Sequence, residues 1–244
     1  MAEFSIRIAG HTARVCSLFA STRDYCGKYL TEAMPECEIT VTREDLVFEQ
    51  EALRQEALEE GIRIRTFTDP FLERTAIQRK LAEFLFDRDI LMTHGSTVAV
   101  DGKAYLFTAK CGTGKSTHTR LWRQVFDQRA VMVNDDKPFL KLTEGGVFAC
   151  GSPWSGKHGL DTNVTLPLQG ICILTRGKEN HIERLLLEEA LPLLMHQSYC
   201  PLNQSKHARF EELVRRLAKN TSLWHMECNM DPSAAEVSHN AMSG

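Results

Sequence analysis

The chain has 244 residues, of which 43% are hydrophobic and 25% charged, and its formal net charge is −3. This is typical of a globular protein with one substantial domain and room for a smaller one. The small negative charge predicts no broad attraction to nucleic acid or to anionic membranes. No apolar run is long enough to cross a bilayer, and residues 1–7 lack the pattern of a signal peptide. We therefore expect a cytoplasmic protein with no nucleic-acid or membrane partner, and homo-oligomer formation stays open.

Residues 1–68 predict a small α+β segment that precedes the main domain, residues 69–244. Alternation of apolar and polar residues favours strands at 4–8, 38–42 and 62–67. A stretch rich in Glu, Ala and Leu, residues 48–60, favours a helix that ends near a glycine.

The main domain opens with a helix and then a strand pair. Asp69 and Pro70 suit the N-cap and first position of a helix. Farther on, Asp101-Gly102 separates two apolar runs, 96–100 and 105–107, which is a strong hairpin signal. The second strand of this pair is therefore expected to lie antiparallel to its predecessor.

A phosphate-binding loop is predicted directly after that hairpin. The segment fits G-x-x-x-x-G-K-[ST], with alanine at the first glycine position. Glycines there let backbone N–H groups turn inward around phosphate oxygens, and the following helix adds its positive N-terminus. The alternative is a glycine-rich turn without a ligand. The predicted nucleotide-binding residues are Ala109, Cys111, Gly112, Thr113, Gly114, Lys115, Ser116 and Thr117.

Individual residues of this loop have distinct expected roles. Lys115 can reach the β- and γ-phosphates of ATP, and the Ser116 hydroxyl can bind Mg²⁺. Cys111 is expected among the inward N–H groups, where a thiolate would be favoured and oxidation could block the nucleotide. The favoured interpretation is that it only fills space in the loop. The eight cysteines include no C-x-x-C pair, so a structural zinc site is not expected.

Two adjacent carboxylates end the next apolar strand. The run 130–134 leads into Asp135-Asp136, and one helix between the loop and this run would bring both to the same sheet edge. Two carboxylates beside a phosphate loop can divide the work, with one on the metal and one as proton acceptor. The alternative is an Asn-Asp-Asp surface turn.

The remaining sequence predicts a second hairpin, a glycine-rich loop and a helical C-terminal part. The loop, residues 151–157, carries Trp154 and Lys157, and Trp154 is either a lid over the site or a residue packed on the sheet. The expected elements are strands 139–142, 146–150, 168–174 and 224–227, and helices 184–195, 208–219 and 232–241.

Taken together, His94-Gly95, the hairpin, the phosphate loop, the paired aspartates and the glycine-rich loop resemble the catalytic domain of HPr serine kinase/phosphorylase. The resemblance covers about residues 85–240. It implies an α/β fold shared with phosphoenolpyruvate carboxykinase, in which the phosphate loop sits on a mixed sheet with antiparallel pairing. It also places His94 near the phosphates. Thr117 stands where that family usually has glutamate, and its phosphorolysis loop is not recognisable here, so the acceptor does not carry over.

The sequence therefore predicts an ATP- and Mg²⁺-dependent kinase that phosphorylates a hydroxyl of a protein, peptide or small molecule. Asp135 is expected to be the base and Asp136, with Ser116, to hold the metal, although the two aspartates can be reversed. Lys157 and Arg176 are candidates for stabilising the charge of the transferred phosphoryl group. The alternative for Lys157 is a solvated loop lysine, and the alternative for Arg176 is a surface position at the end of a strand. For His94 the alternative is a hydrogen-bonded core histidine. A non-catalytic nucleotide-sensing module for regulation or peptide maturation is the alternative function, and a small-molecule carboxykinase is disfavoured by size.

Overall fold

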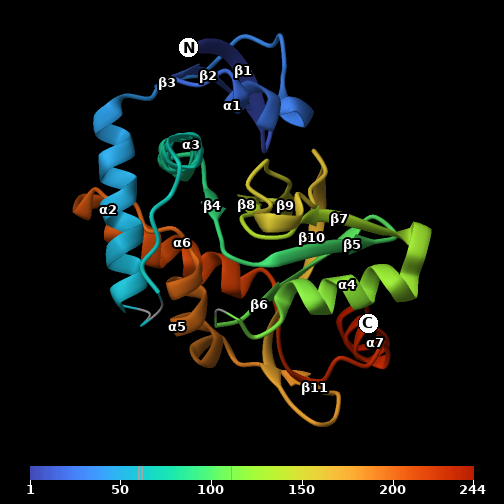
Figure 1. Ribbon diagram of the computed structural model, residues 1–244. Coiled ribbons are helices and arrows are strands. Elements are labelled where there is room, and N and C mark those ends of the chain that lie inside the picture. Colours follow the sequence, from blue (N-terminus) through green and yellow to red (C-terminus); the bar gives the residue numbers. More distant parts are fainter. Residues whose placement is uncertain (60, 62, 111) are drawn as a thin grey trace. The chain divides into compact units, whose positions relative to one another are not determined.

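The computed structural model describes residues 1–59, 61, 63–110 and 112–244, and it divides into two compact units, Met1–Leu85 and Phe86–Gly244 (Figure 1). The sequence placed the division after residue 68. The structural division comes later because α3, Asp69–Phe86, packs with the first unit rather than opening the second. Among the described residues, no helix is both long and apolar enough to cross a membrane.

The first unit is a three-stranded sheet with helices, in the strand order β1-β2-β3. β1 and β2 pair antiparallel, and β2 and β3 pair parallel. Phe4, Ile6 and Ile8 alternate into the core of this unit. The elements are β1 (Ala2–Ile8), β2 (His11–Ser17), α1 (Ser21–Tyr25), β3 (Cys37–Thr40), α2 (Arg43–Glu59) and α3.

Two predictions for this unit need correction. The strand expected at 62–67 is wrong for the residues that the structure describes there, because 63–67 form no strand and Ile64 is exposed without a neighbouring strand. Residue 62 lies outside the described residues. β2 was not predicted, because its sequence, His-Thr-Ala-Arg-Val-Cys-Ser, alternates between small and polar residues with little apolar signal.

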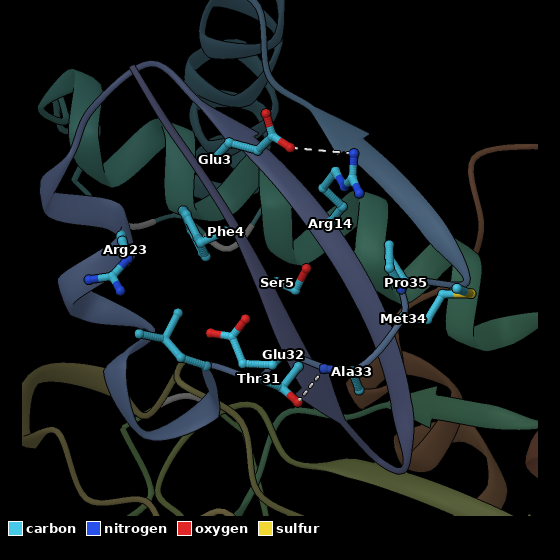
Figure 2. A pocket seen from close by; sticks show the side chains of 11 residues that line it. Glu3, Phe4, Ser5, Arg14, Arg23, Thr31, Glu32, Ala33, Met34 and Pro35 are labelled. Carbon is cyan, nitrogen blue, oxygen red and sulfur yellow. Dashed lines mark hydrogen bonds and ion pairs between the residues drawn. The ribbon is translucent and has the colours of Figure 1, made fainter.

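The first unit also contains a cavity of about 550 Å³ (Figure 2). It lies between the β1–β2 hairpin and the segment 30–35. Glu3 and Arg14 form an ion pair at its rim, 3.4 Å between Oε1 and Nη1, and the Ala33 N–H donates to Thr31 Oγ1 at 3.2 Å. Arg23 and Glu32 supply its other charged groups.

The second unit is built on a mixed sheet in the order β4-β8-β9-β10-β6-β5-β7, with β12 pairing β10 and β11. β6, β10 and β12 are parallel to one another, whereas β5 is antiparallel to both β6 and β7. The strands are β4 (Ile90–Met92), β5 (Ser96–Val100), β6 (Lys103–Thr108), β7 (Ala130–Asn134), β8 (Phe139–Thr143), β9 (Gly146–Cys150), β10 (Thr165–Arg176), β11 (His181–Arg184) and β12 (Ser222–Cys228).

The predicted hairpins are confirmed. β5 and β6 pair antiparallel across Asp101-Gly102, and β8 and β9 pair antiparallel in the same way. The mixed sheet with antiparallel pairing at β6 is therefore as expected. One predicted helix began too early: Arg184 ends β11, and α5 begins at Leu187. Leu185 and Leu186 connect the strand to α5.

Helices cover both faces of the central strands. Tyr105 and Phe107 of β6 pack with α4 (Lys115–Phe126) and α7 (Ser233–Met242), while Leu106 packs with α5 (Leu187–Gln197) and α6 (His207–Lys219). Because both faces are covered, β6 reads as a continuous apolar run in the sequence. The burial of these side chains fixes β6, and therefore the loop that follows it.

One sheet edge gathers the ends of four strands. β6, β10 and β12 run parallel, and β7 runs in the same direction because two antiparallel steps separate it from β6. Their C-terminal ends therefore meet at one edge, which we call the carboxyl edge. The segments that leave it are 109–114, 135–137, 177–178 and 229–230.

Candidate functional site

The loop between β6 and α4 holds two glycines in backbone conformations that other residues rarely adopt. Gly112 and Gly114 adopt positive φ values of 75° and 124°, and a Cβ at Gly112 would meet no atom within 4 Å. No side chain caps the N-terminus of α4, whose N-cap is Gly114. A helix N-terminus without a side-chain cap is a favourable position for an anion. Ala109 is buried and is not among the described non-glycine residues with positive φ, so the position does not require glycine.

Neighbouring groups brace this loop. Arg176, at the end of β10, donates from Nη2 to Gly112 O at 2.5 Å and from Nε to Thr113 O at 3.2 Å. Lys115 Nζ lies 3.4 Å from Ala109 O. Arg176 thus holds the loop by donating hydrogen bonds to the loop's carbonyl oxygens. Its predicted role on phosphoryl charge stays a prediction. Cys111 lies outside the described residues.

A cavity of about 500 Å³ lies beside the loop at the carboxyl edge. One wall is the start of α4, and the other is formed where β10 and β12 end. Met230 is strongly exposed at this site and His118 is buried. The lining residues are Gly112, Thr113, Gly114, Thr117, His118, Leu174, Arg176, Gly177, Cys228, Asn229 and Met230.

The aspartate pair follows β7 in a tightly held turn. Asn134 Oδ1 accepts the N–H groups of Asp136 and Lys137 at 2.8 and 2.7 Å. Its Nδ2 donates to Ser152 O at 2.8 Å. A buried asparagine therefore fixes the direction in which both carboxylates leave the sheet, which excludes a loosely solvated turn.

His94 and Gly95 lie against Asp136. The Gly95 N–H donates to Asp136 O at 3.0 Å, and His94 Nε2 lies 3.4 Å from Asp136 Oδ1. A Cβ at Gly95 would lie 2.5 Å from Leu106 Cδ1 and 3.1 Å from Phe107 O, so glycine allows this close approach.

Burial controls the ionisation of this contact. It lowers the pKa of His94 to about 3, with smaller effects in the same direction from the charges of Lys137, Lys115 and His196. Burial also raises the pKa of Asp136, against the opposing charges of Lys137 and Lys115. His94 is therefore neutral at neutral pH, and its contact with Asp136 is not an ion pair.

Besides Lys115, a second cation, Lys137, acts on His94 and Asp136, and the sequence did not predict it. Its charge acts on both His94 and Asp136 more strongly than that of Lys115. Its position directly after the aspartate pair was the available signal. Lys157 is exposed on the short turn Gly156–His158 and is not among the charges that act on His94 or Asp136.

The glycine-rich loop contributes packing rather than a mobile lid. Trp154 is only 6% exposed, and its carbonyl oxygen accepts the Lys137 N–H at 3.1 Å. Of the two interpretations from sequence, packing against the protein is the one observed. Gly156 adjoins the carboxylate, since a Cβ there would lie 3.4 Å from Asp136 Cβ.

Asp135 is held by buried hydroxyl groups. Ser96 Oγ donates to Asp135 Oδ1 at 2.6 Å, and Ser96 Oγ lies 2.7 Å from Thr119 Oγ1 on α4. Neither hydroxyl was predicted, because residues on β5 and in the second turn of α4 meet only through the tertiary fold.

The carboxyl edge offers a limited set of metal donors. Among the described residues, no group of three or more His, Cys, Asp or Glu side chains could hold a metal ion. Ser116 is exposed in the first turn of α4. One hydroxyl and one or two carboxylates match the way Mg²⁺ is bound when substrate phosphates complete its coordination.

Comparison with solved structures finds a distant structural similarity. No protein-family model matches the chain, and no curated protein is similar at a significant level. The solved structure of the HPr(Ser) kinase/phosphatase from Coxiella burnetii is 11% identical, with a TM-score of 0.36, over 63% of this chain and 99% of that chain. At this distance the similarity supports no role for any residue.

Proposed function

We propose that this protein is an ATP- and Mg²⁺-dependent phosphotransferase that acts on a hydroxyl group. The observation that carries the proposal is the geometry of the carboxyl edge. Lys115 opens α4 directly after two glycines with positive φ, and Asn134 fixes Asp136 directly after β7. The charge of Lys115 acts to lower the pKa of Asp136, against the effect of burial. A phosphate-facing cation and a partly protonatable carboxylate at one sheet edge are the two groups that phosphoryl transfer to a hydroxyl requires.

The nucleotide would bind along the loop and its neighbouring cavity. The uncapped N–H groups of α4 and the backbone around Gly112 and Gly114 suit the phosphates, with Lys115 on the β- and γ-groups. The cavity of about 500 Å³ beside Thr117 has room for the nucleoside. Arg176 would keep the loop in this shape by holding its carbonyl oxygens.

For the two aspartates, the geometry favours the reverse of the first assignment from sequence. Asp135 accepts a hydrogen bond from Ser96 and is 9% exposed, which suits a fixed metal-side carboxylate together with Ser116. Asp136 is more exposed and has a raised pKa, which suits a proton acceptor. Bound Mg²⁺ would supply charge neutralisation at the phosphates.

In the reaction, Asp136 would accept the proton of the acceptor hydroxyl as the hydroxyl oxygen bonds to the γ-phosphorus. The bond between the γ-phosphorus and the β,γ-bridging oxygen would break at the same time, and ADP would leave. Lys115 and Lys137 would lie beside the phosphoryl group and neutralise its charge. Neutral His94, 3.4 Å from Asp136, would limit the positions open to that carboxylate. Positioning and charge account for most of the expected rate.

The test is transfer of labelled γ-phosphate from Mg-ATP to cell lysate, hydroxyl metabolites and short peptides. Lys115→Ala is the control, since it removes the main phosphate-facing charge. Labelling by the parent protein that disappears in the control supports the proposal. ATP binding without any transfer would replace it with the nucleotide-sensing function, and the absence of ATP binding would refute both.

A further inference from the structure

Two buried hydroxyl groups connect Asp135 to the helix that follows the glycine loop. Ser96 on β5 is fully buried, and Thr119 on α4 is 1% exposed. The Ser96 hydroxyl lies 2.6 Å from Asp135 Oδ1 and 2.7 Å from Thr119 Oγ1. Thr119 Oγ1 also lies 3.3 Å from Ser116 O and 3.5 Å from Lys115 O.

Which hydroxyl donates in each of these hydrogen bonds follows from the number of hydrogens available. Each hydroxyl has one hydrogen. Ser96 gives its hydrogen to Asp135, so Thr119 must donate to Ser96. The longer distances from Thr119 to the α4 carbonyl groups agree with this direction. The hydrogen bonds therefore run from Thr119 to Ser96 to Asp135 and end on an accepting carboxylate oxygen.

We infer that Ser96 and Thr119 are positioning residues of the phosphotransfer site, which hold the Asp135 carboxylate oriented and in register with the first turns of α4. This rests on the proposed function, and it assigns these hydroxyls a role in it. Thr119 belongs to the same helix as Lys115 and Ser116. The first turns of α4 and the Asp135 carboxylate, directly after β7, are thus joined by side chains, not only through the sheet.

A neighbouring residue provides the matched control. Thr97 follows Ser96 on β5, is equally buried, and has an Oγ1 without a hydrogen-bond partner among the described residues. Thr97→Val removes a buried hydroxyl from the same strand that takes no part in the hydrogen bonds between Thr119, Ser96 and Asp135. Thr119→Val removes the donor that orients Ser96, and Thr119→Ser retains it.

Phosphate transfer is measured at varied ATP and varied Mg²⁺ for the parent protein and these variants, at temperatures well below each melting point. We expect Thr119→Val and Ser96→Ala each to lower kcat or raise the Mg²⁺ requirement by about tenfold or more, as for groups that orient metal ligands. The KM for ATP should change less. Thr119→Ser should restore most of the loss, and the double variant should lose no more than either single one.

Two results would overturn the inference: a Thr119→Val variant that behaves like Thr97→Val, or a Thr119→Ser variant as impaired as Thr119→Val, which would indicate packing alone. A parent protein without transfer would refute the proposed function separately. In that case the ¹³C carboxyl signal of Asp135 decides: it should shift in Ser96→Ala and Thr119→Val but stay unchanged in Thr97→Val. An Asp135 signal that does not move in either variant overturns the inference.

Discussion

The cavity of the first unit, about 550 Å³, and the cavity beside the glycine loop, about 500 Å³, are similar in size but differ in the groups around them. In the first, the opposite charges of Glu3 and Arg14 already satisfy one another (Figure 2). In the second, the start of α4 has no side-chain cap, and loop carbonyl groups are held by Arg176. A helix N-terminus without a side-chain cap favours an anionic ligand more than volume does.

The largest difference between the two cavities should appear in nucleotide binding. Lys115→Ala should weaken Mg-ATP binding at least tenfold and abolish turnover, because it removes the cation that faces the phosphates. Arg14→Ala, in the first unit, should leave both unchanged. Calorimetric titration with Mg-ATP measures this. Equal affinity for the parent protein and Lys115→Ala would disprove the nucleotide site, and a loss in Arg14→Ala would move it to the first unit.

The two aspartates should separate by the step that they affect. Asp136→Asn should reduce the chemical step by about 10²-fold or more, as for loss of a general base, with nucleotide affinity largely kept. Asp135→Asn should mainly raise the Mg²⁺ concentration needed for turnover. Single-turnover rates at several Mg²⁺ concentrations distinguish the two. The opposite pattern would restore the first assignment, and equal mild effects would remove the division of roles.

Substitution of Lys137 or Lys157 should have a smaller effect on turnover. The pair compares a lysine whose charge acts on His94 and Asp136 with an exposed lysine whose charge does not. Lys137→Met should lower kcat about tenfold, because its charge acts on the site cluster. Lys157→Met should have little effect, since Lys157 is exposed. Steady-state transfer assays on both variants test this. A larger loss for Lys157→Met would show that the glycine-rich loop closes over the phosphates.

The smallest predicted effect concerns stability. Burial lowers the pKa of His118, in the wall of the second cavity, to about 4. Between pH 6.5 and about 4 the unfolded chain therefore binds a proton that the folded protein excludes, and stability falls as pH falls. The loss is up to about 1.4 kcal/mol per pH unit from this residue. Urea unfolding at pH 7 and 5 should show a weaker pH dependence in His118→Asn. An unchanged dependence would contradict the prediction.

Much of the second unit was predictable because its signals are local. The Asp-Gly turn specifies the β5–β6 hairpin, and the glycine loop between an apolar run and a helix specifies the break between β6 and α4. The first unit was less predictable. β2 has few large apolar residues, and the apolar alternation at 62–67 lacks a partner strand in the described part of the chain.

For the site, the sequence by itself identified the residue types whose chemistry depends on order along the chain: Lys115 and Ser116 after the glycines, and Asp135-Asp136 after a strand. Only the tertiary structure decided which groups meet them. Ser96 reaches Asp135, and Thr119 reaches Ser96, because β5 lies beside β7 and α4 packs against both strands. Such contacts join residues far apart in sequence, and burial then sets the ionisation of His94 and Asp136, which no local pattern encodes.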